Sequence, residues 1–264
     1  MKHKPAFSSE QPLLSKDPKN ILILGASGSI GFAMFQQVQS RFPSSQLFLM
    51  ARNTQVLAQQ IEQTALQPES IRTIPIDLES PEKIEQACLE IPSKTAIDLV
   101  FIASGWLHDS QFSPEKTWQS LDAESLHKSY QINTVGPALF IKQLFKQIDL
   151  SHPMVIGILS ARVGSISDNR MGGWHSYRAS KAALNMLIKN FAIELTRKRK
   201  PVCIVGLQPG TTDSALSKPF QRHIAPDQLQ SPEFTSAKLF DVLQTLSLKD
   251  SGKLFDFEGD CFEP

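Results

Sequence analysis

The chain has 264 residues and a formal net charge of +1, with 41% hydrophobic and 20% charged residues. That balance is typical of a globular protein with an apolar core, and it argues against nucleic-acid or membrane-surface partners. Three widely spaced cysteines show no metal-ligand pattern, so we expect no metal site and a cytoplasmic location. The polar first 19 residues contain no signal-peptide-like apolar run and predict a flexible tail before one domain, residues 20–264.

Seven short apolar segments predict strands at residues 21–24, 46–51, 71–76, 97–103, 154–159, 202–207 and 253–257. Helical patterns lie between them, after residue 31, at 53–66, at 81–89, twice within 113–148, through Tyr177, and at 234–246. Asn133 is expected near the start of the second helix of the 113–148 pair, and Pro137 is expected to bend that helix. The alternation predicts a single α/β domain with a doubly wound, seven-stranded parallel sheet and helices on both faces.

Residues 25–31 read G-A-S-G-S-I-G and join the first strand to the first helix. This arrangement places backbone N–H groups and a helix N-terminus against a pyrophosphate. Arg52 follows the second strand, and no carboxylate occurs from residue 47 to 53 to bind a ribose 2′-hydroxyl. A planar guanidinium can instead pair with a 2′-phosphate. The sequence therefore indicates a dinucleotide site that prefers NADP(H), with NAD(H) as the alternative.

Tyr177 and Lys181 stand four residues apart in the long predicted helix, so both side chains face one way. A nearby cation lowers the pKa of a tyrosine towards neutrality, which suits proton exchange with a carbonyl or an alcohol. Such spacing is common in solvent-facing helices, so its meaning depends on the rest of the chain. Ligands bind at the carboxyl ends of strands in an open parallel sheet. Six candidate residues follow such ends: Gly25, Arg52, Asp77, Ser104, Ser160 and Pro209.

Taken together, these motifs resemble the short-chain dehydrogenase/reductase family from about residue 21 onwards. The resemblance is carried by the Tyr177-x-x-x-Lys181 pair, Ser160 upstream, the glycine turn and Pro209-Gly210. Residues 163–174 (V-G-S-I-S-D-N-R-M-G-G-W) and 209–220 (P-G-T-T-D-S-A-L-S-K-P-F) are similar to C-factor-like and Sniffer-like carbonyl reductases. The resemblance implies a Rossmann fold and NADP(H)-dependent hydride transfer to or from a small carbonyl or alcohol substrate.

The resemblance also implies roles for individual residues. Tyr177 would be the proton donor, Lys181 would lower its pKa and hold the nicotinamide ribose, and Asn133 would support Lys181 through water. Ser160 would hydrogen-bond the substrate carbonyl. The implied cofactor-binding residues are Gly25, Ser27, Gly28, Ser29, Ile30, Gly31, Arg52, Asp77, Leu78, Ala103, Ser104, Gly105, Tyr177, Lys181, Pro209, Gly210 and Thr212. Leu107, His108 and Trp174 are expected to line the substrate pocket, with a hydrophobic plug as the alternative for Trp174.

The chain departs from the family pattern in several places. Ser29 stands where glycine is usual, and residues 102–105 (I-A-S-G) replace the usual Asn-Asn-Ala-Gly. The common spacing back from Gly164 would put the catalytic serine position at Ala161, whereas the strand register favours Ser160. Ser165 is a remote alternative.

These departures leave a second function open, a C-factor-like signalling protein that binds the cofactor with little turnover. A sugar-nucleotide epimerase is disfavoured, because the segment after Pro209 is too short for a separate substrate domain. Related folds often pair through the long helices after strands four and five, which suggests a homodimer.

Overall fold

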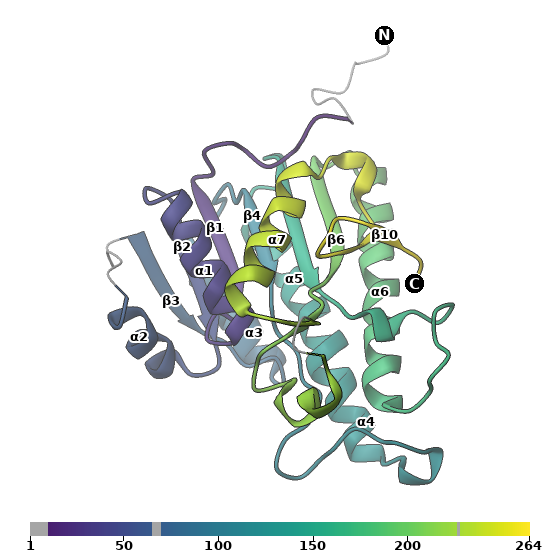
Figure 1. Ribbon diagram of the computed structural model, residues 1–264. Helices are drawn as coiled ribbons and strands as arrows, with labels where there is room; N and C mark the ends of the chain where they lie inside the picture. Colours follow the sequence, from purple (N-terminus) through teal and green to yellow (C-terminus); the bar gives the residue numbers. More distant parts are fainter. Residues whose placement is uncertain (1–9, 65–69, 226–227) are drawn as a thin grey trace.

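The computed structural model describes residues 10–64, 70–225 and 228–264, and its centre is one eight-stranded sheet (Figure 1). The strand order is β10-β9-β6-β5-β4-β1-β2-β3, and neighbouring strands are parallel except β9 and β10. The strands of this sheet are β1 (Asn20–Leu24), β2 (Gln46–Ala51), β3 (Ile71–Pro75), β4 (Leu99–Ile102), β5 (Met154–Leu159), β6 (Val202–Gln208), β9 (Leu254–Asp256) and β10 (Cys261–Phe262). Two short strands, β7 (Thr211–Thr212) and β8 (Leu229–Gln230), pair separately.

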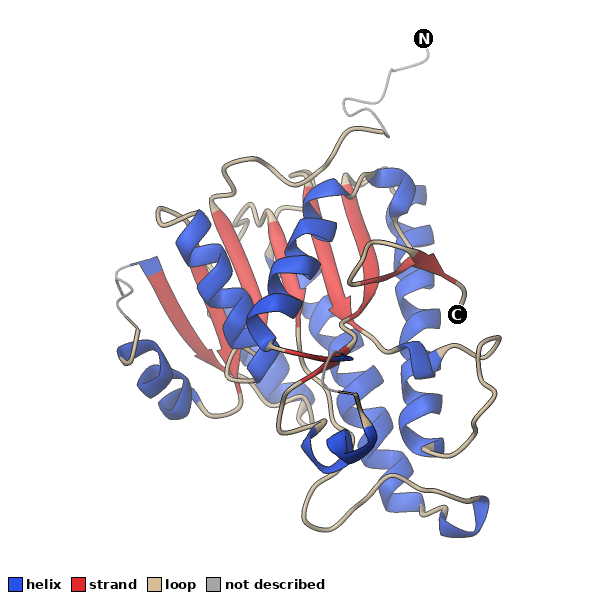
Figure 2. Cartoon of the chain, in the orientation of Figure 1, coloured by secondary structure: helices blue, strands red, loops and turns tan. Residues whose placement is uncertain are grey.

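Helices cover both faces of the sheet (Figure 2). The α-helices are α1 (Ser29–Arg41), α2 (Thr54–Glu62), α3 (Pro81–Leu89), α4 (Ala123–Tyr130), α5 (Gly136–Gln147), α6 (His175–Arg197) and α7 (Pro232–Thr245). Buried side chains of α1, α2 and α7 belong to one apolar cluster, and those of α3, α5 and α6 belong to a second on the opposite face. The expected doubly wound α/β domain is therefore confirmed.

The core strands show why continuous apolar runs predicted this sheet. All six residues of β5 are buried, and successive side chains join opposite clusters, Val155 on one face and Ile156 on the other. A strand covered by helices on both faces has no polar side, so it reads as an unbroken apolar run. The chain leaves β1 towards β2 and β3 and then returns to place β4 on the other side of β1. This reversal opens a crevice at the carboxyl ends of the strands, where ligands bind in such sheets.

The number of strands differs from the sequence-based expectation. The sheet has eight strands rather than seven, because the two-residue strand β10 turns back antiparallel to β9; two residues are too few for a recognisable pattern. Asn133 lies three residues before the start of α5, close to its expected place. It lies in a π-helical turn, Gln131–Val135, that joins α4 and α5 into one continuous helical segment, and Pro137 sits in the first turn of α5.

The predicted limits of two other segments also shift. The helix expected to reach residue 66 ends as α2 at Glu62, and residue 66 lies outside the described residues. Within the segment expected to be a tail, residues 1–9 lie outside the description, whereas Leu13 and Leu14 are buried in the apolar cluster of α1 and α7. The amide of Leu13 donates to the carbonyl of Leu246 at 2.8 Å. No helix in the described part of the chain is long and apolar enough to cross a membrane.

Candidate functional site

Two neighbouring cavities lie at the carboxyl ends of the strands. The first, about 450 Å³, is lined by nine of the residues predicted to bind the cofactor: Gly25, Ser27, Gly28, Arg52, Asp77, Leu78, Ala103, Ser104 and Gly105. The second, about 390 Å³, is lined by Ser160, Trp174, Tyr177, Pro209, Gly210 and Thr212. Leu107 and Leu216 line both cavities. The structure thus brings most of the predicted residues into one divided cleft.

The glycine turn at the end of β1 approaches other backbone very closely. Gly25 has a φ of +84°, and a Cβ there would lie 2.9 Å from the amide nitrogen of Ser104. A Cβ on Gly31 would lie 2.2 Å from the carbonyl oxygen of Gly25. Ser29 is the first residue of α1 and is only partly buried, so the serine at this departure from the family pattern is accommodated without a backbone clash.

This turn fits the pyrophosphate of a dinucleotide. Helix α1 begins at Ser29 after Gly28, which offers no side-chain cap, and its first turn contains no acidic residue. The N–H groups at the start of a helix have no intrahelical partner, and the helix dipole favours an anion there. The buried hydroxyl oxygen of Ser104, which lines the same cavity, also has no hydrogen-bond partner among the described residues.

The far wall of the first cavity carries Arg52 and Asp77. The side chain of Arg52 is exposed and forms no ion pair with any described residue. Burial alone would raise the pKa of Asp77, but the amide of Glu79, the ammonium of Lys83 at 3.0 Å and the nearby Arg52 together lower that pKa below its usual value. A free guanidinium beside a carboxylate suits a ligand that carries both an anionic group and hydroxyl or amino donors.

Asn133 connects the cleft loop to the helical layer. Its Oδ1 accepts the Trp106 amide at 2.8 Å, and its Nδ2 donates to the Trp106 carbonyl at 2.8 Å. The Nδ2 group also lies 3.2 Å from the hydroxyl of Ser129 and 3.1 Å from that of Ser180. Asn133 therefore braces the loop after β4, in a chain that lacks the two asparagines usual there.

Tyr177 and Lys181 do share one face of α6, but their environment differs from the sequence-based expectation. Lys181 is 2% exposed and its Nζ donates to the Leu159 carbonyl at 2.9 Å, while Nζ lies 5.8 Å from the centre of the Tyr177 ring. Burial raises the pKa of Tyr177 to about 12 and lowers that of Lys181 to about 8. Burial therefore disfavours the phenolate, and Tyr177 is protonated at neutral pH.

Ser160 lies at the end of β5 and lines the second cavity, but its hydroxyl points to a buried partner. It is 4% exposed, and its Oγ donates to the Oδ1 of Asn185 on α6 at 2.6 Å. Ala161 lines the same cavity. The alternative Ser165 is 2% exposed, and its Oγ accepts the Asp168 amide at 3.2 Å within a turn.

The second cavity has an aromatic wall. Trp174 lies with its ring centre 6.3 Å from that of Tyr177 and 5.0 Å from that of Phe220. His108 packs edge-on against Phe220, and its Nε2 lies 3.0 Å from the Leu216 carbonyl oxygen. Of the residues predicted to bind substrate, Trp174 and Leu107 line this cavity, whereas His108 lines the first cavity.

Sequence reasoning missed the contribution of the segment after β6. Leu216 lines both cavities, and Phe220 packs beside Trp174 in the aromatic wall of the second. Both lie in the 209–220 stretch that carried part of the family resemblance, but its conformation depends on distant contacts. Four predicted residues line neither cavity: Ser29, Gly31, Asn133 and Lys181. Gly31 is buried under the glycine turn, and Ile30 lines the second cavity rather than the first.

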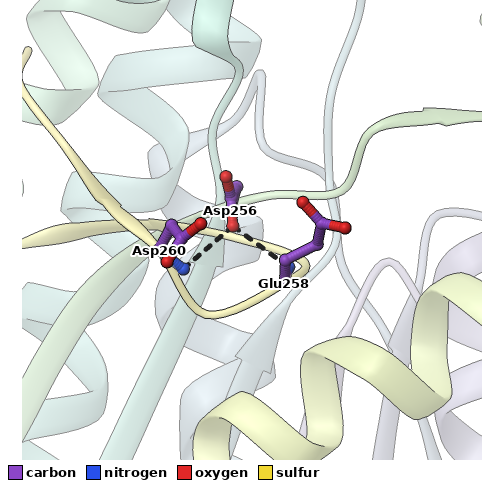
Figure 3. Close-up of side chains that lie close together, drawn as sticks. All are labelled: Asp256, Glu258 and Asp260. Carbon is purple, nitrogen blue, oxygen red and sulfur yellow. Dashed lines mark hydrogen bonds between the residues drawn. The ribbon is translucent and has the colours of Figure 1, made fainter.

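Three carboxylates gather in the turn between β9 and β10, where the sequence suggested no metal site (Figure 3). One ligand oxygen from each of Asp256, Glu258 and Asp260 lies within 4.8 Å of the others. The Oδ1 of Asp256 accepts the amides of Glu258 and Asp260, each at 3.0 Å. That oxygen already stabilises the turn, so the cluster is explained by local backbone geometry.

Comparison with known proteins gives a consistent result. A family model described as short chain dehydrogenase matches residues 19–225. The chain is 31% identical over 187 residues to a 1-hydroxy-2-glutathionyl-2-methyl-3-butene dehydrogenase of Rhodococcus sp. (strain AD45), covering 70% of this chain and 76% of that protein. It is 26% identical over 139 residues to the C-signal protein of Myxococcus xanthus, covering 53% and 78% of the two chains.

Solved carbonyl reductases share the fold. The NADPH-bound carbonyl reductase from chicken fatty liver superposes with a TM-score of 0.81 at 22% identity, covering 94% of this chain and all of that one. The carbonyl reductase Sniffer of D. melanogaster superposes with a TM-score of 0.79 at 21% identity, covering 93% and 99%. The expected likeness to C-factor-like and Sniffer-like proteins is confirmed.

The buried amine of Lys181 predicts a specific pH dependence of stability. The folded protein releases this proton near pH 8, whereas the unfolded chain holds it up to about pH 10.5. Between these values the unfolded state binds more protons, so raising the pH from 8 to 10 should stabilise the fold relative to Lys181→Met, with a slope of up to about 1.4 kcal/mol per pH unit. Urea unfolding of both proteins at pH 8, 9 and 10 measures this difference, in which other titrating groups cancel. Parallel pH profiles would contradict the depressed pKa.

Proposed function

Because this chain belongs to the short-chain dehydrogenase family, we propose that it is an NADP(H)-dependent oxidoreductase that interconverts a small carbonyl compound and its alcohol. One observation carries the proposal: Tyr177 lines a cavity directly beside the one lined by the glycine turn and Arg52, with the buried Lys181 behind it. A binding protein without turnover would have no use for a desolvated amine next to a phenol. The aromatic and aliphatic lining of the second cavity favours an apolar carbonyl compound.

Each proposed residue has a defined part in the reaction. NADP(H), when bound, supplies the hydride to the carbonyl carbon or accepts it from the alcohol. Tyr177 gives its phenolic proton to the carbonyl oxygen during reduction and takes it back during oxidation. The Lys181 ammonium stabilises the phenolate that forms when Tyr177 gives up its proton. Asn133 holds the loop after β4 through its two hydrogen bonds to Trp106. The pKa of about 12 for Tyr177 keeps it protonated at neutral pH, the state that reduction requires.

The test of this function is Tyr177→Phe, assayed as NADPH consumption with a panel of aldehydes, ketones and quinones. We expect turnover to fall by at least about 100-fold, because general acid catalysis typically contributes that much, while NADPH still binds. The ring and its packing against Trp174 remain in this variant. If Tyr177→Phe retains more than a few per cent of the wild-type rate, another group donates the proton and the proposal is wrong.

The proposed role of Ser160 requires a change in the hydrogen bond of its hydroxyl group. A serine hydroxyl has one proton, and here that proton lies towards Asn185, so donation to a substrate carbonyl requires this bond to break. We expect Ser160→Ala to lower the rate about tenfold or more without changing NADPH affinity. Ser165→Ala is the control, because its hydroxyl serves only the 165–168 turn. If Ser160→Ala is as fast as the wild type, the Ser160 hydroxyl serves only to hold the Asn185 side chain. Ala161 then occupies the place where the family usually carries its catalytic serine.

Arg52 underlies the proposed preference for NADP(H). Its unpaired guanidinium lines the first cavity, and hydrogen bonds to charged groups contribute about 1.5–3 kcal/mol each. One such contact with a 2′-phosphate corresponds to roughly a ten- to hundredfold preference. The similar fold of an NADPH-bound carbonyl reductase supports this assignment.

We therefore expect Arg52→Asp to shift the ratio of NADP(H) to NAD(H) affinities towards NAD(H) by roughly ten- to hundredfold. Isothermal titration of both cofactors measures the ratio. Arg197→Asp makes the same charge change at the far end of α6, and it should leave the ratio unaltered. Equal affinities of the wild type for both cofactors, or equal ratios in the two variants, would refute the role of Arg52.

The similarity to C-signal supports a second candidate, a cofactor-binding signalling protein. The same experiments separate the two functions. Tight NADPH binding with no reduction of any carbonyl in the panel would favour signalling, whereas turnover that depends on Tyr177 favours the enzyme.

A further inference from the structure

The buried carboxylate of Glu115 has no part in the proposed reaction. It lies in the long segment between β4 and α4, and only 4% of the residue is exposed. None of the ion pairs among the described residues involves it. Burying a carboxylate costs free energy unless it accepts hydrogen bonds. The groups that donate to Glu115 therefore indicate its role.

Those partners belong mainly to the start of the catalytic helix. One carboxylate oxygen of Glu115 accepts the Ser176 amide at 3.2 Å, and the other accepts the Ser176 hydroxyl. The Ser125 hydroxyl, on α4, makes a longer contact at 3.5 Å. In addition, the main-chain carbonyl of Glu115 accepts the amide of Trp174. The side chain of Glu115 thus holds Ser176, and its main-chain carbonyl holds Trp174. One residue therefore fixes both positions at the start of α6.

Helix α6 lacks a cap of its own. The residue before its first turn, Trp174, is in the left-handed region with φ 49° and provides no side-chain hydrogen bond, and the first turn has no acidic residue. The free N–H groups and the dipole at a helix N-terminus are stabilised by a negative group. Glu115, from 61 residues earlier in the chain, supplies that group.

The two residues held by Glu115 flank the reaction site. Ser176 directly precedes Tyr177, so the capping contact fixes the turn that carries the phenol. The ring of Trp174 forms the aromatic wall with Phe220. A left-handed conformation of a bulky residue is unfavourable, and the hydrogen bond from the Trp174 amide to Glu115 helps to hold it.

We propose that Glu115 is a positioning residue, which caps α6 from a distant loop and thereby sets both the Tyr177 phenol and the Trp174 wall of the substrate cavity. This inference rests on the proposed reductase function for its kinetic consequence, but its structural content is independent of turnover. Glu115 does not line either cavity, so it acts through the helix and not on the substrate.

The first test is kinetic. Glu115→Gln keeps the size of the side chain but removes its charge, and we expect kcat for the carbonyl substrate to fall by about 10- to 100-fold through misplacement of the phenol. The dissociation constant for NADPH should change less than about twofold, since the first cavity is built from other strand ends. An unchanged kcat would overturn the proposal.

A matched pair of serine variants separates capping from general destabilisation. Ser176→Ala and Ser125→Ala each remove one hydroxyl that contacts the same carboxylate, but only Ser176 lies on α6. We expect a fall in kcat for Ser176→Ala and little change for Ser125→Ala. Equal effects of the two variants would overturn the capping role, and this comparison remains decisive if Glu115→Gln fails to fold.

The second test needs no activity. Protein labelled with 5-fluorotryptophan gives one ¹⁹F signal for each of the three tryptophans, and Trp174→Phe assigns the signal of interest. We expect Glu115→Gln to move or broaden the Trp174 signal and to leave that of Trp106 in place. A Trp174 signal that does not respond overturns the proposal whatever the rates show. If wild-type protein reduces no carbonyl compound, the proposed function fails, and this measurement still decides the role of Glu115.

Discussion

The hydrogen bond from the buried ammonium of Lys181 to the Leu159 carbonyl ties α6 to the end of β5. An amine that is 2% exposed loses most of its hydration, and the carbonyl at the end of β5 replaces part of it at 2.9 Å. The helix must approach closely for this contact. A Cβ on Gly164 would lie 2.7 Å from the Cβ of Lys181, so the turn after β5 requires glycine. The same burial lowers the pKa of the Lys181 amine.

Close packing of α6 against α4 depends on small polar residues. The Ser129 hydroxyl lies 3.1 Å from the Ser176 carbonyl and 3.0 Å from the Ser180 hydroxyl, which donates to the Tyr177 carbonyl. Asn133 joins this seam in a π-helical turn, a feature often found at functional sites. The same hydrogen-bonded seam therefore connects the start of α6 with the loop that borders the first cavity.

The division of the cleft into two cavities follows from the loops rather than from the sheet. Leu107, after β4, and Leu216, after β6, line both cavities and form the boundary between them. The short β7–β8 pair ties the segment after β6 to the start of α7, since Thr211 pairs with Leu229. Changes in these loops can reshape the second cavity while leaving the glycine turn and Arg52 in place.

The sequence by itself determined the alternation of strands and helices, the glycine turn and the shared face of Tyr177 and Lys181. These features depend on local periodicity and on the close approach that only glycine allows, as at Gly31. It also predicted which residues follow strand ends, and the cleft contains most of them. The two-residue strand β10 could not be predicted, because two residues are too few to show an alternating side-chain pattern.

Tertiary structure alone decided the properties that arise from distant contacts. Ser160 meets Asn185 across 25 residues, and Glu115 meets Ser176 across 61. The pKa of Tyr177 rises rather than falls, because burial disfavours the charged phenolate. The periodicity of side chains along a helix or strand shows which face of that element a residue occupies. Its desolvation and its hydrogen-bond partners depend on which segments the fold brings together.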